Sequence, residues 1–145
     1  MKFSIAAAAL CIASLAASAV LAATLEIPKR KLGYWEITTV APVSGMTKIN
    51  VCVGPDDDIV TPEGGECSKP TVTPLNEGMI VNVVCTSKEG KQIISTTFTG
   101  DFATRYHAIL KTTFDPPIGA ISHMGVNIDA KYHGPDCKAA EAPGK

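Results

Sequence analysis

Residues 92–114 read QIISTTFTGDFATRYHAILKTTF, and this stretch decides the fold class. In its second half, apolar and charged residues fall on opposite sides of an extended chain: Phe102, Tyr106, Ala108 and Leu110 against Arg105, His107 and Lys111. Alternation with a period of two is the pattern of a strand with one buried face. Gly100-Asp101 interrupts the stretch as a tight turn does. Residues 92–99 and 102–114 are therefore predicted to form an antiparallel hairpin.

The same pattern recurs along the rest of the chain. Valine, isoleucine and threonine provide 35 of the 122 residues after position 23, against four leucines, and such β-branched side chains favour strands. All ten prolines and twelve glycines lie in this part, between the runs. Further strands are predicted at residues 34–40, 47–53, 71–75, 79–85 and 126–132, with 118–123 as the eighth. The sequence predicts an all-β fold, an antiparallel meander of seven or eight strands that curls into a closed or half-open barrel.

One short helix is expected at Pro55–Val60. Proline suits the first helical position, and the carboxylates of Asp56, Asp57 and Asp58 would lie at the positive end of the helix dipole. These acids with Glu63 and Glu66 lack the alternating ligands and central glycine of an EF-hand, so no calcium site is predicted.

The first 23 residues have the features of a cleaved signal peptide. Lys2 is followed by an apolar run that ends in small residues, and cleavage is expected near Ala22 or Ala23. The alternative is an uncleaved membrane anchor, because about 20 apolar residues suffice to span a bilayer. We therefore expect a signal peptide at 1–23, one all-β domain at 24–138, and a disordered tail at 139–145. The expected location is the periplasm, with no transmembrane segment after cleavage.

The cysteine count supports export. Removal of Cys11 with the leader leaves four cysteines, and an even number in a small exported domain indicates two disulfides. No C-x-x-C spacing indicates a zinc site. In an up-and-down meander Cys52 and Cys67 flank one connection, so we predict the pairs Cys52–Cys67 and Cys85–Cys137. The second pair follows by elimination.

No catalytic signature is present after residue 23. There is no Gly-x-Ser-x-Gly elbow, and His107 and His133 fall on the charged faces of their strands. His123, the third histidine, has no recognisable partner in the sequence. We expect the Asp101 side chain to cap local backbone amides. The chain is predicted not to be an enzyme and to hold no metal or cofactor. Its net charge near −2 after residue 23 gives no reason to expect nucleic acid as a partner.

The predicted apolar concave face supports a binding function. A periplasmic module would hold an apolar small molecule or a lipid in a cavity of at least roughly 300 Å³. The residues expected to line this cavity are Trp35, Ile37, Val51, Val83, Phe98, Tyr106 and Ile128. The alternative is a structural or protein-interaction domain of the cell envelope with a filled core, in which Trp35 is a plug and the partner is an envelope protein.

Several landmarks together resemble a known family. Lys31-Leu32-Gly33-Tyr34-Trp35-Glu36, Val51-Cys52-Val53, Thr99-Gly100-Asp101, and Gly134 followed by Cys137 are similar to motifs of the exported proteobacterial proteins grouped as domain of unknown function 3617. The resemblance spans about residues 29–137. This chain departs from the usual family pattern at Leu32, where proline is common, and at Gly54-Pro55, where Thr-Pro is common. The family has no established activity, so the resemblance implies class and compartment only.

A weaker similarity concerns the fold alone. Gly33-x-Trp35 followed by a meander resembles the start of lipocalin-type barrels, in which a basic side chain from the last strands packs over the tryptophan. The resemblance implies that Lys131 would take that role.

Overall fold

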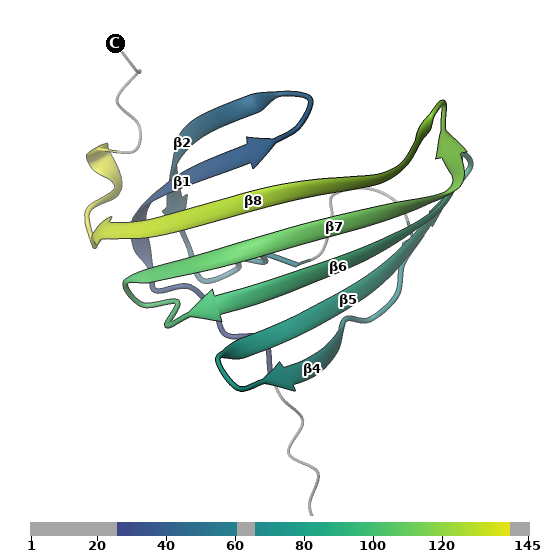
Figure 1. The fold of residues 1–145 in the computed structure, drawn as a ribbon. Helices are drawn as coiled ribbons and strands as arrows, with labels where there is room; N and C mark the ends of the chain where they lie inside the picture. Colours follow the sequence, from purple (N-terminus) through teal and green to yellow (C-terminus); the bar gives the residue numbers. More distant parts are fainter. Residues whose placement is uncertain (1–25, 61–65, 140–145) are drawn as a thin grey trace, which may run out of the picture.

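The computed structural model describes residues 26–60 and 66–139, and these residues form one antiparallel β-sheet (Figure 1). Its strands are β1 (Gly33–Ala41), β2 (Gly45–Val53), β3 (Glu66–Cys67), β4 (Thr71–Leu75), β5 (Gly78–Ser87), β6 (Gly90–Gly100), β7 (Arg105–Ile118) and β8 (Ile121–Gly134). A single 3-10 turn, η1 (Cys137–Ala139), follows β8. The predicted all-β class is confirmed.

The sheet is a half-open meander. Its hydrogen-bonded order is β2-β1-β8-β7-β6-β5-β3, and β4 also pairs with β5. The last strand of the chain therefore lies beside the first, with Ile37 opposite Ala130. No strand pair in the described residues joins β2 to β3 or β4, so hydrogen bonds do not close the sheet into a barrel. The chain between β2 and β3 leads from one edge of the sheet to the other.

The predicted helix at Pro55–Val60 is wrong. Residues 55 and 56 form a turn, and residues 57–60 are irregular. Asp57 forms an ion pair with Arg30, and the Asp58 carboxylate accepts the Val60 backbone N–H at 2.8 Å. Aspartate side chains that bond to nearby groups in this way offer the backbone an alternative to a helix.

The predicted separate strand at residues 118–123 is also wrong. β7 runs to Ile118 and β8 begins at Ile121, so these residues form the tip of one long hairpin. Gly119 in this tip has a φ of 61°, a left-handed conformation that suits glycine. The count of eight strands instead includes the two-residue strand β3, which the sequence pattern does not reveal.

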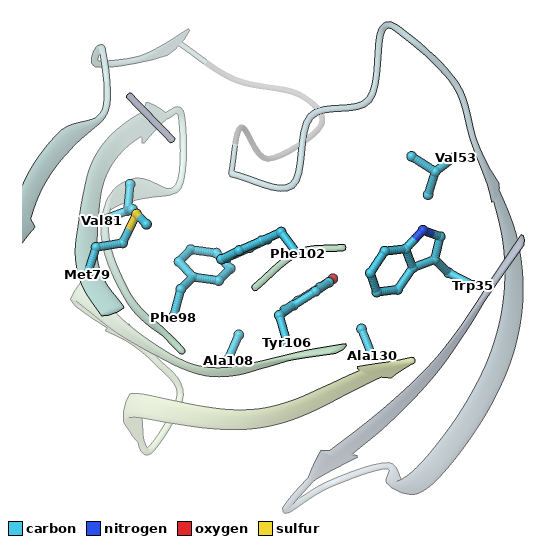
Figure 2. Packing of buried hydrophobic residues seen from close by; sticks show 9 residues of the cluster. All are labelled: Trp35, Val53, Met79, Val81, Phe98, Phe102, Tyr106, Ala108 and Ala130. Atoms are coloured by element: carbon cyan, nitrogen blue, oxygen red, sulfur yellow. The ribbon is translucent and has the colours of Figure 1, made fainter. Parts of the chain in front are cut away.

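Alternate residues of each strand face the concave side and form two groups of buried side chains. The main cluster is shown in Figure 2 and consists of Trp35, Val53, Met79, Val81, Phe98, Phe102, Tyr106, Ala108 and Ala130. A second cluster is formed by Val83, Cys85 and Ile94, and it lies nearer the turn that joins β5 to β6. Both have Val60 packed against them.

Both predicted disulfide pairings are wrong, although the prediction of two disulfides is supported. The structure joins Cys52 to Cys137 and Cys67 to Cys85. Cys67 lies directly opposite Cys85 in the β3–β5 register. Cys52 lies opposite Tyr34, which in turn lies opposite Gly134, so η1 after β8 reaches β2 by crossing β1. The short sequence separation of Cys52 and Cys67 does not bring them together in space, because Cys52 lies on β2 at one edge of the sheet and Cys67 lies on β3 at the other.

Parts of the predicted organisation lie outside the described residues. These are the signal peptide at 1–23, the Glu63 position, and the tail from residue 140 onward. Among residues 26–60 and 66–139, no helix has the length and apolar character required to cross a membrane.

Candidate ligand site on the concave face

The segment 54–60, here called the strap, packs over the concave face of the sheet. Ile59 and Val60 contact the main cluster, and the core side chains are enclosed between the curved sheet and the chain that crosses opposite it (Figure 2). Asp57 ties the strap to the N-terminal segment: Arg30 Nε donates to Asp57 Oδ2 at 2.8 Å, and Arg30 Nη2 bonds to Asp57 Oδ1. Such a bidentate pair fixes orientation as well as distance.

This ion pair lies next to Tyr106 at the core boundary. The side chains of Arg30 and Asp57 are only 8% and 15% exposed. Burial opposes the charge of the guanidinium, but the hydrogen bond with Asp57 and the influence of Tyr106 outweigh it and raise the pKa of Arg30. Burial also raises the pKa of the Tyr106 hydroxyl, with Arg30 acting in the opposite direction. The ion pair is therefore part of the folded structure rather than a loose surface contact.

A cavity of about 260 Å³ remains between the strap and the sheet. The sheet contributes side chains from β6, β7 and β8, and the strap contributes its last three residues. The lining residues are Asp58, Ile59, Val60, Ile94, Thr96, Phe98, Tyr106, Leu110 and Ile128. The lining is mostly apolar, and the polar groups that its side chains carry are the Thr96 hydroxyl, the Tyr106 hydroxyl and the Asp58 carboxylate. This arrangement suits a small apolar molecule better than an ion.

The strand registers place all seven residues predicted to line the cavity on the concave face. Phe98, Tyr106 and Ile128 line it. The other four pack elsewhere: Trp35 is fully buried in the main cluster, Val83 is buried in the second, Ile37 packs against the main cluster, and half-buried Val51 lies opposite Trp35 on β2. The cavity is also smaller than the predicted volume of roughly 300 Å³.

The lining residues that sequence reasoning missed fall into two groups. Ile94, Thr96 and Leu110 carry the same period-two signal as Phe98 and Tyr106, so the pattern could have included them. Ile59 and Val60 carry no such signal because the strap is irregular. Arg30 was missed because its partner lies 27 residues away in the sequence.

Trp35 packs in the part of the core that lies over β1 and β8, and it does not line the cavity. Its Nε1–H donates to the Lys31 carbonyl at 2.7 Å, and its ring contacts Tyr106 and Tyr132 at centroid distances of 5.8 and 5.5 Å. The basic group near this part of the core is Lys31, whose Nζ lies 4.6 Å from the Tyr132 ring centroid. Lys131 lies opposite Glu36 and Arg105 on the convex face, so its expected packing over the tryptophan is wrong.

The β6–β7 turn places another aromatic residue in the core. Asp101 Oδ1 accepts backbone N–H groups from Ala103, Thr104 and Arg105, and Oδ2 accepts the Thr104 hydroxyl at 2.7 Å. These bonds, that of the Thr104 hydroxyl first, hold the pKa of Asp101 well below its ordinary value. The predicted capping role is confirmed. Phe102 has a φ of 56° and stacks on Tyr106 with 5.0 Å between ring centroids.

The three histidines lie on the convex face and do not converge. His107 is opposite Asp129, His123 is opposite Thr113, and the His133 ring lies 5.0 Å from Tyr34. A shallow hollow of about 490 Å³ on this side is lined by charged residues, including the Arg105–Asp129 ion pair. Within residues 26–60 and 66–139, no three His, Cys, Asp or Glu side chains gather as metal ligands would.

The fold and the cavity define a small half-open antiparallel β-meander whose concave face is covered by a disulfide-flanked strap. The model of the family described as "Protein of unknown function (DUF3617)" matches residues 30–137, and the chain belongs to this family. The matched segment begins at Arg30 and ends at Cys137, so it contains the ion pair, the strap and both disulfides. No curated protein and no solved structure gives a significant match.

Proposed function

We propose that this protein is an exported, non-catalytic module that binds a small apolar molecule beneath the strap. The cavity of about 260 Å³ between the strap and strands β6–β8 carries this proposal. A water molecule occupies about 30 Å³ in the liquid, so the cavity suits a ligand of about nine non-hydrogen atoms. A complete lipid is too large for it. The ligand class is therefore narrower than the sequence alone suggested.

Binding of 1-octanol, which has this size, tests the proposal. The expected result is saturable change at the methyl groups of Leu110 and Ile128 in NMR spectra. Ile128→Phe fills the cavity and should abolish the change, whereas Ile109→Phe, on the exposed convex face of β7, should leave it intact. Changes that fail to saturate, or that persist in Ile128→Phe, would contradict ligand binding here.

The proposal that the protein is not an enzyme is supported by the separation of the histidines on the convex face and by the oxidation of all four cysteines after residue 23. We expect no turnover of chromogenic ester, phosphate, glycoside or peptide substrates. Turnover that a His107→Gln or His123→Gln substitution abolishes would overturn this proposal.

Export to the periplasm is supported by the two disulfides, which persist in oxidising compartments. We propose cleavage of the signal peptide near Ala22 or Ala23. The intact mass of protein released from the periplasm should correspond to a chain that begins at Ala23 or Thr24 with four oxidised cysteines. A mass that includes the leader would favour the membrane anchor instead.

The close packing around Trp35 supports a second candidate function, that of a structural or protein-interaction domain of the cell envelope. Trp35 is completely buried, and four of the seven predicted lining residues pack away from the cavity. If this second function is correct, the 1-octanol titration should show no saturable change. The partner would then be an envelope protein.

A further inference from the structure

The concave face of the sheet carries a buried hydroxyl among apolar neighbours. Thr96 lies in the middle of β6, opposite Val81 on β5 and Leu110 on β7. Its neighbours on the same face of β6 are Ile94 and Phe98. Because all four neighbours are apolar, a valine of nearly the same shape would fill this position without bringing an oxygen into the core.

The Thr96 hydroxyl has no hydrogen-bond partner within residues 26–60 and 66–139. Thr96 is only 7% exposed, and β6 is paired on both sides, so the nearby backbone groups are engaged in the two ladders. In the described part of the chain, every completely enclosed side-chain nitrogen or oxygen has a partner. The Thr96 oxygen therefore keeps some accessible surface, and this surface faces the cavity that Thr96 lines.

The other two polar groups of the cavity lining already have partners. The Tyr106 hydroxyl lies beside the Arg30 guanidinium, which forms a hydrogen bond with it. The Asp58 carboxylate accepts the Val60 backbone N–H at 2.8 Å, and Asp58 is exposed. A buried polar group without a partner is destabilising unless water or a ligand bonds to it. In this cavity Thr96 is the group that a ligand can satisfy.

The charges at the cavity disfavour an anionic ligand. Asp58 is the one charged residue among the described residues that line it. The charge of Arg30 is compensated by Asp57, and Lys29 lies in an adjoining hollow of about 370 Å³ together with Asp56, Asp57 and Asp58. A carboxylate headgroup inside the cavity would therefore meet a like charge and no cation in the lining.

We propose that the ligand is a neutral molecule with one hydrogen-bonding oxygen, which bonds to the Thr96 hydroxyl while its carbon chain contacts the apolar lining. This inference rests on the proposed function, and it names the chemical class of the ligand. An alcohol and a ketone both fit, because a threonine hydroxyl can donate as well as accept. A hydrocarbon would leave the hydroxyl unpaired.

The dissociation constants of 1-octanol and 1-chlorooctane for the full exported chain test the inference. The two probes have the same number of non-hydrogen atoms, but 1-chlorooctane carries no oxygen. Headspace gas chromatography above the protein solution measures both. Thr96→Val should weaken 1-octanol binding about fivefold, as expected for the loss of one hydrogen bond between neutral groups. It should leave 1-chlorooctane binding unchanged or tighter. By NMR titration, heptanoate of the same size should bind the wild type about tenfold more weakly than 1-octanol does.

The matched control is Thr112→Val. Thr112 is 6% exposed on the concave side of β7, opposite Ile94, and it does not line the cavity. Its substitution should leave both dissociation constants unchanged, and thermal unfolding should show that both valine variants are folded.

The possible outcomes separate this inference from the proposed function. If 1-octanol does not bind the wild type saturably, both are wrong. If it binds and Thr96→Val leaves its dissociation constant unchanged, or weakens both probes equally, the inference alone is overturned and the apolar site stands. An equal loss of 1-octanol binding in Thr112→Val would also overturn the inference, because the effect would then not depend on contact with the cavity.

Discussion

Asp101 determines the conformation of a core aromatic residue although its own side chain is exposed. Three backbone N–H groups and one hydroxyl converge on its carboxylate, and the next residue, Phe102, takes a left-handed conformation that residues other than glycine rarely adopt. The Phe102 carbonyl in turn accepts the Lys31 backbone N–H at 2.9 Å. The turn therefore connects the core to the segment that carries Arg30.

Asp101→Asn should destabilise the fold, and the loss should depend on pH. The pKa of folded Asp101 lies below its ordinary value of 3.8, so its charged form stabilises the fold at pH values above the unfolded pKa. This contribution is lost as the pH falls through the range below about 4. Urea unfolding followed by Trp35 fluorescence should give a constant difference from wild type between pH 7 and 5, and a shrinking one at pH 3.

Thr104→Ala, which removes only the hydroxyl donor, should show a smaller effect with the same pH trend. A difference between Asp101→Asn and wild type that grows as the pH falls would contradict the assigned role of the carboxylate.

Among the structural elements, the strap owes its position to side chains distant in sequence. The ion pair of Arg30 and Asp57 fixes one part, and the contacts of Ile59 and Val60 with the core fix another. Its covalent flanks are Cys52 and Cys67, each in a different disulfide. The strap can therefore cover the cavity without regular secondary structure.

Arg30→Met should destabilise the protein by about 3 kcal/mol, since breaking a buried ion pair leaves one charge without its partner. Arg30→Met with Asp57→Asn should recover part of this loss, because the double variant buries no uncompensated charge. Urea unfolding at pH 7 measures both. As a control, Lys48→Met breaks an ion pair with Glu36 in which the lysine is 58% exposed, and it should cost under about 1 kcal/mol. Equal losses for Arg30→Met and Lys48→Met would contradict the buried role of Arg30.

The difference between strands and strap explains what the sequence could predict. Alternation in residues such as Tyr106 and Ala108 is a local signal, and it predicted the long strands and their concave faces, although it missed the two-residue strand β3 and misplaced one strand at residues 118–123. Pro55 followed by three aspartates also gives a local signal, for a helix, but a tertiary ion pair with Arg30 overrides it. The cavity is formed by the sheet on one side and the strap on the other. The sequence predicted some of the lining residues on the sheet, but none of those on the strap.

At the scale of the whole molecule, the position of the last strand determines the disulfides. β8 lies between β7 and β1, and this return to the first strand places Cys137 within reach of Cys52, with 5.4 Å between their Cα atoms. The meander pattern alone does not specify this return. Pairing by proximity along the chain therefore failed, whereas the number of disulfides followed from the even cysteine count.

The connectivity can be measured through unfolding free energies. Cys52 and Cys137 are 85 residues apart, and a bond across a loop of this length contributes about 4.5 kcal/mol in the chain-entropy model, against about 3 kcal/mol for the 18 residues between Cys67 and Cys85. Cys52→Ala, Cys137→Ala and the double variant each remove the same bond, so their stabilities should agree closely. Cys52→Ala with Cys67→Ala removes two different bonds, so its loss should approach the sum of the two single losses. If Cys52→Ala with Cys67→Ala instead matched its single variants, the two residues would share one bond, and the placement of β8 beside β1 would have to be abandoned with the pairing.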